Sequence, residues 1–248
     1  MGGKMNMFWE IHRDIPREGP GDNTSTRKAL QMLTNLPEPS IVLDIGCGPG
    51  MQTIELARNL DGKIFALDNH QYFLDVLKKS AEENGLSNKI QPVNGSMFSL
   101  DFEQRSFDLI WAEGSVYIIG FERGLKEWSN YLKQGGFIGV TEISWLTKDI
   151  PEEPKMFWET NYPGIQSISQ NIQTVEDLGF KPIGHFILPE ASWWENYYLP
   201  LGQRIYSFRQ QYKDSYEANK ELDEAQYEID LYRRYSQFYG YVFYLMQK

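Results

Sequence analysis

Cysteine and histidine are scarce in this sequence, which has one cysteine and three histidines among 248 residues. A single cysteine excludes an internal disulfide bond and any cysteine-rich zinc or iron–sulfur site. No two of His12, His70 and His185 have the spacing of metal ligands on one helix. We therefore expect no bound metal.

Long apolar runs are also missing. None approaches the roughly 20 apolar residues that a membrane-spanning helix needs. The first residues, Met1–Met5, lack the apolar segment of a secretory signal peptide. We therefore expect a cytoplasmic protein that has no contact with a membrane.

Basic residues are outnumbered, with 24 Lys and Arg against 34 Asp and Glu and a formal net charge of −10. Nucleic acids are bound through clustered Lys and Arg that release counterions, so we expect no nucleic-acid partner. A small ligand, neutral or cationic, agrees better with this charge.

Apolar segments of strand length alternate with helical patterns through the first 142 residues. Such alternation predicts a parallel sheet with helices on both faces. After residue 143 the pattern loosens into a sixth strand, a helical and tyrosine-rich stretch, and a last strand. The predicted strands cover 41–45, 63–67, 89–94, 107–112, 137–142, 182–188 and 241–246.

The first predicted strand ends in a glycine-rich turn. Ile41–Ile45 is followed by Gly46, Gly48 and Gly50, and then by a helical pattern. Such a turn suits a nucleotide-like ligand, because glycine lets the ligand approach the backbone at the start of the helix. Dinucleotide-binding enzymes favour G-x-G-x-x-G, whereas this turn reads D-x-G-x-G-x-G from Asp44.

The turn resembles motif I of the class I S-adenosylmethionine (SAM) dependent methyltransferases. Three later segments resemble further parts of the same family: Asn94–Phe98 after the third strand, Phe107–Gly114 along the fourth, and Lys133–Gly136 before the fifth. The resemblance covers about residues 40–142.

The resemblance implies a Rossmann-like three-layer α/β sandwich. Its seven-stranded sheet is expected to be mostly parallel, with an antiparallel last strand and a helical insertion before that strand. We expect a single domain over residues 1–248. Its expected parts are an N-terminal lid and helix (1–36), a SAM-binding core (40–142), a substrate-side insertion (143–170) and a helical insertion (192–238).

The resemblance also implies SAM as cofactor and S-adenosylhomocysteine (SAH) as product. Asp68, at the end of the second strand, is expected to bind both ribose hydroxyls; the alternative is an ordinary loop aspartate. Asp44 is expected either to fix the turn or to approach the amino group of SAM. The predicted cofactor residues of these segments are Asp44, Gly46, Cys47, Gly48, Gly50, Asp68, Asn69, Ser96, Met97, Ala112 and Glu113.

One position departs from the family. Ser96 stands where an acid usually binds the adenine amine, and serine accepts a hydrogen bond more weakly than an ionised acid. Met97 either holds adenine by apolar contact or simply packs. The Asn/Asp-Pro-Pro-Tyr sequence of DNA methyltransferases and of some protein N-methyltransferases is missing, which argues against those substrates.

The segment before the first helix extends the resemblance. Glu18–Gly21, together with Gly114–Tyr117 and Gly120–Gly124, resembles a subgroup of bacterial small-molecule methyltransferases of type 11. That resemblance implies that Gly19 and Gly21 fold over the cofactor; the alternative is a plain N-terminal loop.

Methyl transfer from SAM is an in-line displacement, which a protein accelerates mainly by alignment and exclusion of water. A base would help some acceptors, and the candidates by position are His12, Glu113, Tyr117 and Glu142. Tyr117 and Trp145, after the fourth and fifth strands, are expected to face the substrate.

We expect a small-molecule acceptor as partner. The tyrosine-rich helical stretch is expected to support a lid or to form a homodimer contact. Two alternative functions stay open from the sequence: an NAD-linked oxidoreductase with an unusual turn, and a non-catalytic SAM-binding protein.

Overall fold

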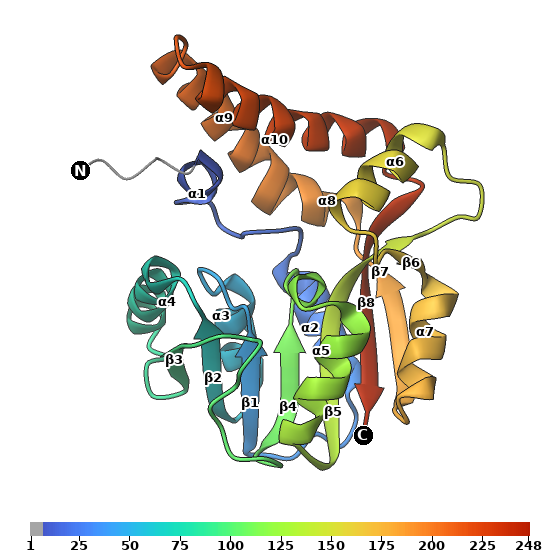
Figure 1. Cartoon of the computed structure of the whole chain (residues 1–248). Helices are drawn as coiled ribbons and strands as arrows, with labels where there is room; N and C mark the ends of the chain where they lie inside the picture. Colours follow the sequence, from blue (N-terminus) through green and yellow to red (C-terminus); the bar gives the residue numbers. More distant parts are fainter. Residues whose placement is uncertain (1–6) are drawn as a thin grey trace.

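One mixed sheet forms the centre of the molecule and carries helices on both faces (Figure 1). The computed structural model describes residues 7–248, so the expectation drawn from Met1–Met5 lies outside the described part. The strand order is β3-β2-β1-β4-β5-β8-β7, and the short β6 pairs with β5. The strands are β1 Ser40–Ile45, β2 Gly62–Asp68, β3 Ile90–Asn94, β4 Phe107–Ala112, β5 Leu132–Trp145, β6 Gln166–Ser167, β7 Lys181–Ile187 and β8 Tyr239–Gln247.

The last strand runs against its neighbours. β8 pairs antiparallel with both β5 and β7, whereas the pairs among β1 to β5 are parallel. The predicted fold class, a mostly parallel sheet with an antiparallel last strand, is therefore confirmed. The carboxyl ends of the parallel strands meet at one edge, and the start of β8 lies at that same edge.

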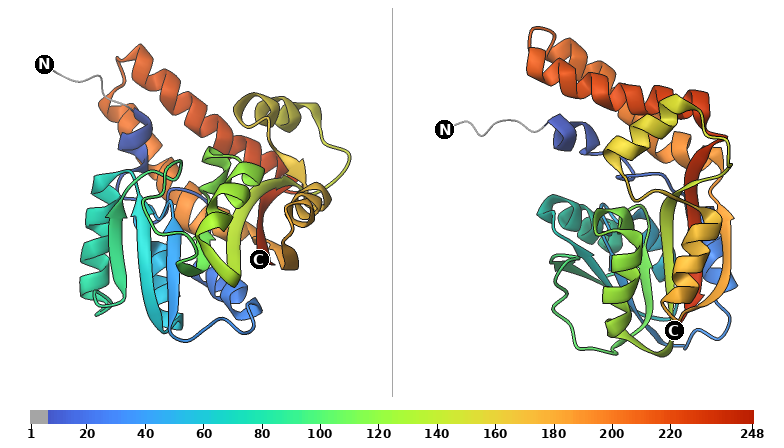
Figure 2. Two further views of the ribbon diagram at one scale, coloured as in Figure 1. Left: turned by 60° about the horizontal axis from the view of Figure 1, so that its bottom comes forward. Right: turned by 45° about the vertical axis from the view of Figure 1, so that its right-hand side comes forward.

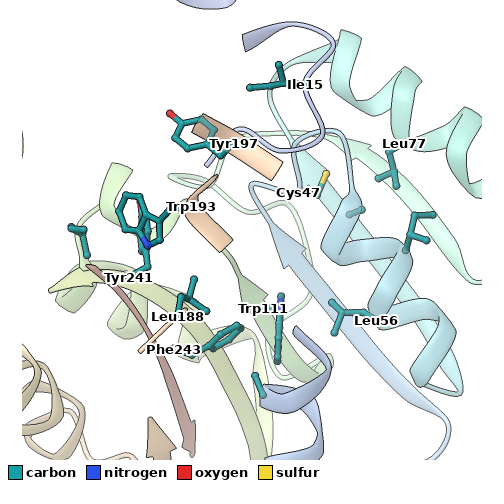
Figure 3. Packing of buried hydrophobic residues seen from close by; sticks show 14 of the residues in the cluster. Ile15, Cys47, Leu56, Leu77, Trp111, Leu188, Trp193, Tyr197, Tyr241 and Phe243 are labelled. Atoms are coloured by element: carbon teal, nitrogen blue, oxygen red, sulfur yellow. The ribbon is translucent and has the colours of Figure 1, made fainter. Parts of the chain in front are cut away.

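Strands buried on both faces divide the core in two. In β1, Val42 packs into one cluster and Leu43 into the other, because successive side chains of a strand point to opposite faces. The first cluster, partly drawn in Figure 3, joins Trp111 and Phe243 of the sheet to Leu56 of a covering helix. This double burial explains why β4, for example, is a short segment made almost wholly of apolar residues.

The helices of the described chain cover the two faces and the carboxyl edge. Helices α2 and α3 contact each other on one face, and α5 and α7 contact each other on the other. The α-helices are α1 Met7–His12, α2 Asn23–Met32, α3 Met51–Asn59, α4 Gln71–Glu83, α5 Phe121–Trp128, α6 Glu152–Asn161, α7 Ile168–Asp177, α8 Glu190–Trp193, α9 Leu199–Gln211 and α10 Tyr216–Tyr235. Two 3-10 turns, η1 Val116–Ile118 and η2 Ser129–Tyr131, and a π-helical turn, η3 Trp194–Tyr198, complete them.

A helical cap lies over the carboxyl edge of the sheet. Helices α9 and α10 pack along each other, and α1 lies between them and the sheet (Figures 1 and 2). Arg204 of α9 donates a hydrogen bond of 2.6 Å to the carbonyl of Glu10 in α1. The stretch predicted as helical over 192–238 thus forms the cap. No helix among residues 7–248 is both long and apolar enough to cross a membrane.

Candidate functional site

A cavity lies at the carboxyl edge of β1, β2 and β4, under α1. It measures about 1000 Å³ with its open mouth included. The turns that follow these strands form one side of its wall. Two N-terminal stretches, Phe8–Trp9 and Arg17–Gly19, form another.

Most of the predicted cofactor residues line this cavity, and some do not. Those in the wall are Gly19, Gly46, Cys47, Gly48, Asp68, Asn69, Ser96, Met97 and Glu113, and Tyr117 joins them. The predicted cofactor residues outside the wall are Gly21, Asp44, Gly50 and Ala112. Of the other candidates, His12, Glu142 and Trp145 also lie outside it.

The glycine turn after β1 needs its glycines. Gly46, Gly48 and Gly50 have φ angles of 71°, 52° and 89°, which side chains with a Cβ rarely adopt. A Cβ at Gly46 would lie 2.5 Å from the Cβ of Ser115, and one at Gly50 would collide with Leu77. Gly50 is therefore required for the start of α3 rather than for ligand contact.

The turn is fastened to the end of β2. The backbone amides of Gly46 and Cys47 donate to the carbonyl of Leu67 at 2.8 and 3.0 Å. Asp68 then accepts two more amides, with Oδ2 taking the Gly48 amide and Oδ1 the His70 amide, each at 2.9 Å. Each carboxylate oxygen keeps a second lone pair for a ligand. This geometry suits a carboxylate that accepts two neighbouring ribose hydroxyls.

Asp44 lies behind the turn, fully buried. Thr53 donates a hydrogen bond of 2.6 Å to its Oδ2, whereas its Oδ1 has no partner. Burial raises the pKa of this carboxyl to about 7. Of the two predicted alternatives, the position favours fixing the turn over touching the ligand.

Glu113 takes part in a buried network instead of standing free as a base. Its Oε2 pairs with the Arg17 guanidinium at 2.6 Å. Its Oε1 accepts hydrogen bonds from Thr26 at 2.7 Å and from the Trp111 indole at 2.8 Å. Both oxygens are therefore occupied, and the network ties the N-terminal segment to the end of β4.

Gly21 supports this network from outside the cavity. A Cβ at Gly21 would collide with the guanidinium of Arg17. Its amide donates to the Ser192 carbonyl at 3.0 Å, which fastens the segment to α8. The predicted lid segment thus holds Arg17 in place through Gly21 and contributes Gly19 to the cavity wall.

Glu18 is the most exceptional group of the wall. Its side chain lies next to Gly48, since a Cβ on that glycine would be 3.5 Å from its Cγ. Its Oε1 is buried and has no hydrogen-bond partner. Burial, and then the nearby charge of Asp68, raise the pKa of Glu18 to about 8. A buried carboxyl without partners is suited to a ligand that donates hydrogen bonds or carries positive charge.

Helix α1 brings aromatic rings to the same cavity. The Trp9 ring lies 4.7 Å from the His70 ring and 6.2 Å from the Phe73 ring of α4. Trp9 is nevertheless 40% exposed and lines the cavity, as do Phe8 and Phe73. The cavity thus has an aromatic side next to Asp68.

The turn after β3 adds a weaker polar group. Ser96 lines the cavity, and its hydroxyl accepts the Phe98 amide at 3.3 Å. Met97 and Phe98 stand beside it, and Phe98 is 49% exposed. An apolar surface with one hydroxyl suits a nucleobase that is held mainly by apolar contact and not by a hydrogen bond to a carboxylate.

The remaining candidates lie around the cavity. His12 is buried; its Nδ1 lies 2.8 Å from the Phe8 carbonyl and its Nε2 3.2 Å from the Tyr197 hydroxyl. Burial lowers the pKa of His12 to about 4, so the ring is neutral near pH 7. Trp145 packs edge-on against Tyr239 at 6.4 Å. Burial raises the pKa of the Cys47 thiol, which agrees with a small turn residue and not with a nucleophile.

Arg17, Glu18, Phe8 and Trp9 were not among the predicted site residues. The signal that could have found Arg17 and Glu18 is their place directly before the Gly19–Gly21 segment. The partner of Arg17, however, lies 96 residues away in the chain. The fold alone brings that pair together.

The residues present fit SAM. The Asp68 carboxylate can still accept hydrogen bonds from ribose hydroxyls, and Met97 and Phe98 provide an apolar surface for the adenine ring. The unpaired Glu18 Oε1 is an acceptor for a cationic group. Among residues 7–248, no cluster of three or more His, Cys, Asp or Glu could hold a metal ion.

Comparison with known proteins identifies methyltransferases as similar to this chain. The family model of the methyltransferase domain matches residues 42–136. The sterol 24-C-methyltransferase erg6 of Aspergillus fumigatus is 32% identical over 173 residues, which are 64% of this chain and 45% of that protein. The sterol methyltransferase ERG6A of Gibberella zeae is 31% identical over 177 residues, 66% of this chain and 45% of that protein. The chain thus spans about half the length of these curated relatives.

Solved structures share the fold over nearly the whole chain. A SAM-dependent methyltransferase from Geobacter sulfurreducens, in complex with SAH, has a TM-score of 0.81 at 18% identity and covers 97% of this chain and 96% of its own. YjhP from E. coli has a TM-score of 0.83 at 18% identity, covering 97% of this chain and 98% of its own. A methyltransferase domain is thus matched over residues 42–136, and the fold of the chain is that of the solved SAM-dependent methyltransferase.

Proposed function

We propose that this protein transfers a methyl group from SAM to a small-molecule acceptor. The observation that carries the proposal is the Gly46–Gly50 turn, fastened to the end of β2, with the Asp68 carboxylate beside it in the wall of one cavity. The matched methyltransferase domain favours SAM over the NAD alternative.

SAM, when bound, supplies an electrophilic methyl group on a sulfonium. The chain aligns its ligands and excludes water. Asp68 holds the ribose, and the aromatic rings of Phe8 and Trp9 cover the cavity on the side of α1. Orientation of this kind lowers the activation barrier by roughly 7–11 kcal/mol. A general base is therefore not required for every acceptor. Tyr117, which lines the cavity directly after β4, faces the acceptor.

We infer further that residues 7–21 act as a lid. This segment lines the cavity through Phe8, Trp9 and Arg17–Gly19. The Arg17–Glu113 pair supports a closed position. Cytoplasmic location, Trp145 at the acceptor and a homodimer contact through the tyrosine-rich helices remain parts of the proposal.

Calorimetry and turnover test the function together. SAM and SAH should each bind at submillimolar concentration, and NAD should not. SAH should then form from SAM in the presence of a panel of small amines, alcohols and thiols. The proposal would be wrong if neither SAM nor SAH bound.

SAM binding without turnover on any acceptor would instead support a non-catalytic role. The same fold serves other chemistry, since SpnF, described as a [4+2]-cyclase, has a TM-score of 0.74 to this chain. The turnover measurement therefore decides between a methyltransferase and a non-catalytic SAM-binding protein.

A further inference from the structure

Two oppositely charged residues of the N-terminal segment stand side by side in the cavity wall. Arg17 and Glu18 both line the cavity, directly before Gly19. Arg17 is only 4% exposed. Its Nη1 is buried and has no hydrogen-bond partner, and the buried Oε1 of Glu18 has none either. A buried polar atom without a partner is costly, so each atom is suited to a ligand group that would pair with it.

The Arg17 side chain is held in place on two sides. Its Nη2 pairs with Glu113 at 2.6 Å, and a Cβ on Gly21 would collide with its guanidinium. Glu113 thus occupies one terminal nitrogen and leaves the donors of the other without a partner. A guanidinium fixed in this way is preorganised for a carboxylate, to which it makes charge-assisted hydrogen bonds.

Arg17 is also the one basic side chain among the described residues of the wall. A carboxylate in this cavity has no other lysine or arginine of the described wall to bind. The charge of such a ligand group therefore points to Arg17.

The acids of the wall differ in what they can still accept. Three belong to the described wall: Glu18, Asp68 and Glu113. Both oxygens of Glu113 are occupied, and Asp68 is assigned to the ribose. Glu18 remains, and its Oε1 is the only buried side-chain oxygen of these three acids that lacks a partner. An ammonium group in the cavity is therefore expected at Glu18.

Glu18 lies close to the expected ribose. The Gly48 amide donates to Asp68 at 2.9 Å, and a Cβ on the same glycine would be 3.5 Å from the Glu18 Cγ. Glu18 and Asp68 thus both contact Gly48. SAM carries its amino-acid chain on the ribose, through the sulfur. A ribose at Asp68 would start that chain near Glu18.

We propose that Arg17 and Glu18 bind the amino-acid end of the cofactor, with its carboxylate at Arg17 and its ammonium group at Glu18. The inference rests on the proposed function and adds the residues that select a cofactor with an intact amino-acid end. Both residues lie in the segment that runs from α1 to α2 (Figure 1). Closure of the lid would then depend on the amino-acid end.

Three ligands test the proposal, because they share the nucleoside and the thioether and differ at this end. SAH has the whole amino acid, decarboxylated SAH lacks the carboxylate, and 5′-methylthioadenosine lacks both charged groups. Each is titrated into the protein by calorimetry. SAH should bind about tenfold or more tightly than decarboxylated SAH, the range for a hydrogen bond to a charged group. 5′-Methylthioadenosine should bind most weakly.

Two variants assign the two groups. Arg17→Gln should weaken SAH binding by about tenfold or more and leave the affinities for the other two ligands nearly unchanged. Glu18→Gln should weaken both ligands that carry an amine and leave 5′-methylthioadenosine nearly unchanged. A merely structural role of either residue would weaken all three ligands alike.

Further variants serve as controls. Arg17→Gln leaves Glu113 buried without its cation, which destabilises the fold. Arg17→Lys keeps a cation for Glu113 but lacks the second terminal nitrogen, so it gives the same comparison where Arg17→Gln does not fold. Arg27→Gln and Glu224→Gln, at exposed positions outside the wall, should keep all three affinities. Thermal denaturation checks that the variants fold.

The outcomes separate the two proposals. Equal affinity for SAH and decarboxylated SAH would overturn the assignment of Arg17. A Glu18→Gln variant that weakens all three ligands alike would overturn that of Glu18. Tight binding of SAH without preference over 5′-methylthioadenosine would overturn the inference and leave the proposed function standing. Absence of binding by all three ligands would count against the proposed function and against the inference with it.

Discussion

Two glutamates of the cavity wall differ in their hydrogen-bond partners. The difference indicates which glutamate holds the structure of the site and which is free to bind a ligand. Glu113 has an arginine, a threonine and an indole on its oxygens. Glu18 has a buried oxygen without a partner. An acid with a partner on each oxygen is held in place, so Glu113 supports the site. An acid without a cation is the one available to a ligand.

Asp68 gives the sharpest prediction for a single residue. Asp68→Ala should weaken SAH binding by about 1.5–3 kcal/mol, the range for hydrogen bonds to a charged group. The physical reason is the loss of both ribose acceptors. Calorimetry with SAH measures the change.

The control for this prediction is Asp101→Ala, at an exposed position outside the cavity. Its SAH affinity should equal that of the unaltered protein. Asp68 also accepts the amides of Gly48 and His70, so circular dichroism must show an intact fold. Unchanged affinity in a folded Asp68→Ala protein would refute the ribose assignment.

At the scale of elements, the cap and α1 decide how the cavity closes. Helix α1 is six residues long and is held by α9 through Arg204 and by α4 through the Trp9 contacts. A helix this short has little stability of its own. Its position therefore depends on packing, which makes it suited to open and close.

Trp9→Ala tests the lid. Removal of the ring deletes the contacts with His70 and Phe73 and uncovers the cavity. Aromatic pairs of this kind contribute about 0.5–1.5 kcal/mol, so SAH should bind roughly two- to tenfold more weakly. Faster dissociation in stopped-flow fluorescence should account for most of the change.

The matched variant for the lid is Tyr206→Ala on α9, a ring that is 69% exposed and outside the cavity wall. It should leave SAH dissociation unchanged. If Trp9→Ala releases SAH at the same rate as Tyr206→Ala, α1 does not act as a lid.

At the scale of the whole molecule, local signals in the sequence predict the sheet and one side of the cavity. Most strands of the first part are apolar segments bounded by turn residues, and Asp68 is the last residue of β2. The Arg17–Glu113 pair joins segments 96 residues apart, and no local pattern marks it. Glu228 lies in a polar helical stretch that reads as surface, and the folded cap alone places it against Tyr198.

Burial of unpaired acids also has a consequence for the stability of the whole molecule. Asp44 is 0% exposed and Glu142 1% exposed, and burial raises the pKa of Asp44 to about 7 and that of Glu142 to about 8. Both acids have pKa values near 4 in an unfolded chain. Between these values the folded state binds more protons than the unfolded state. The stability that these protons provide is present below about pH 4 and is lost as pH rises through 7 to 8.

The free energy of unfolding without ligand should therefore fall between pH 5.5 and 7.5, by up to about 1.4 kcal/mol per pH unit for each of the two acids. Urea denaturation at these two pH values measures the change. Glu142→Gln and Asp44→Asn remove one titrating group each, so each should flatten the dependence. Glu224→Gln should not, since that position is exposed. If Asp44→Asn and Glu142→Gln leave the slope between pH 5.5 and 7.5 the same as in the unaltered protein, neither acid is protonated in the folded protein over this interval.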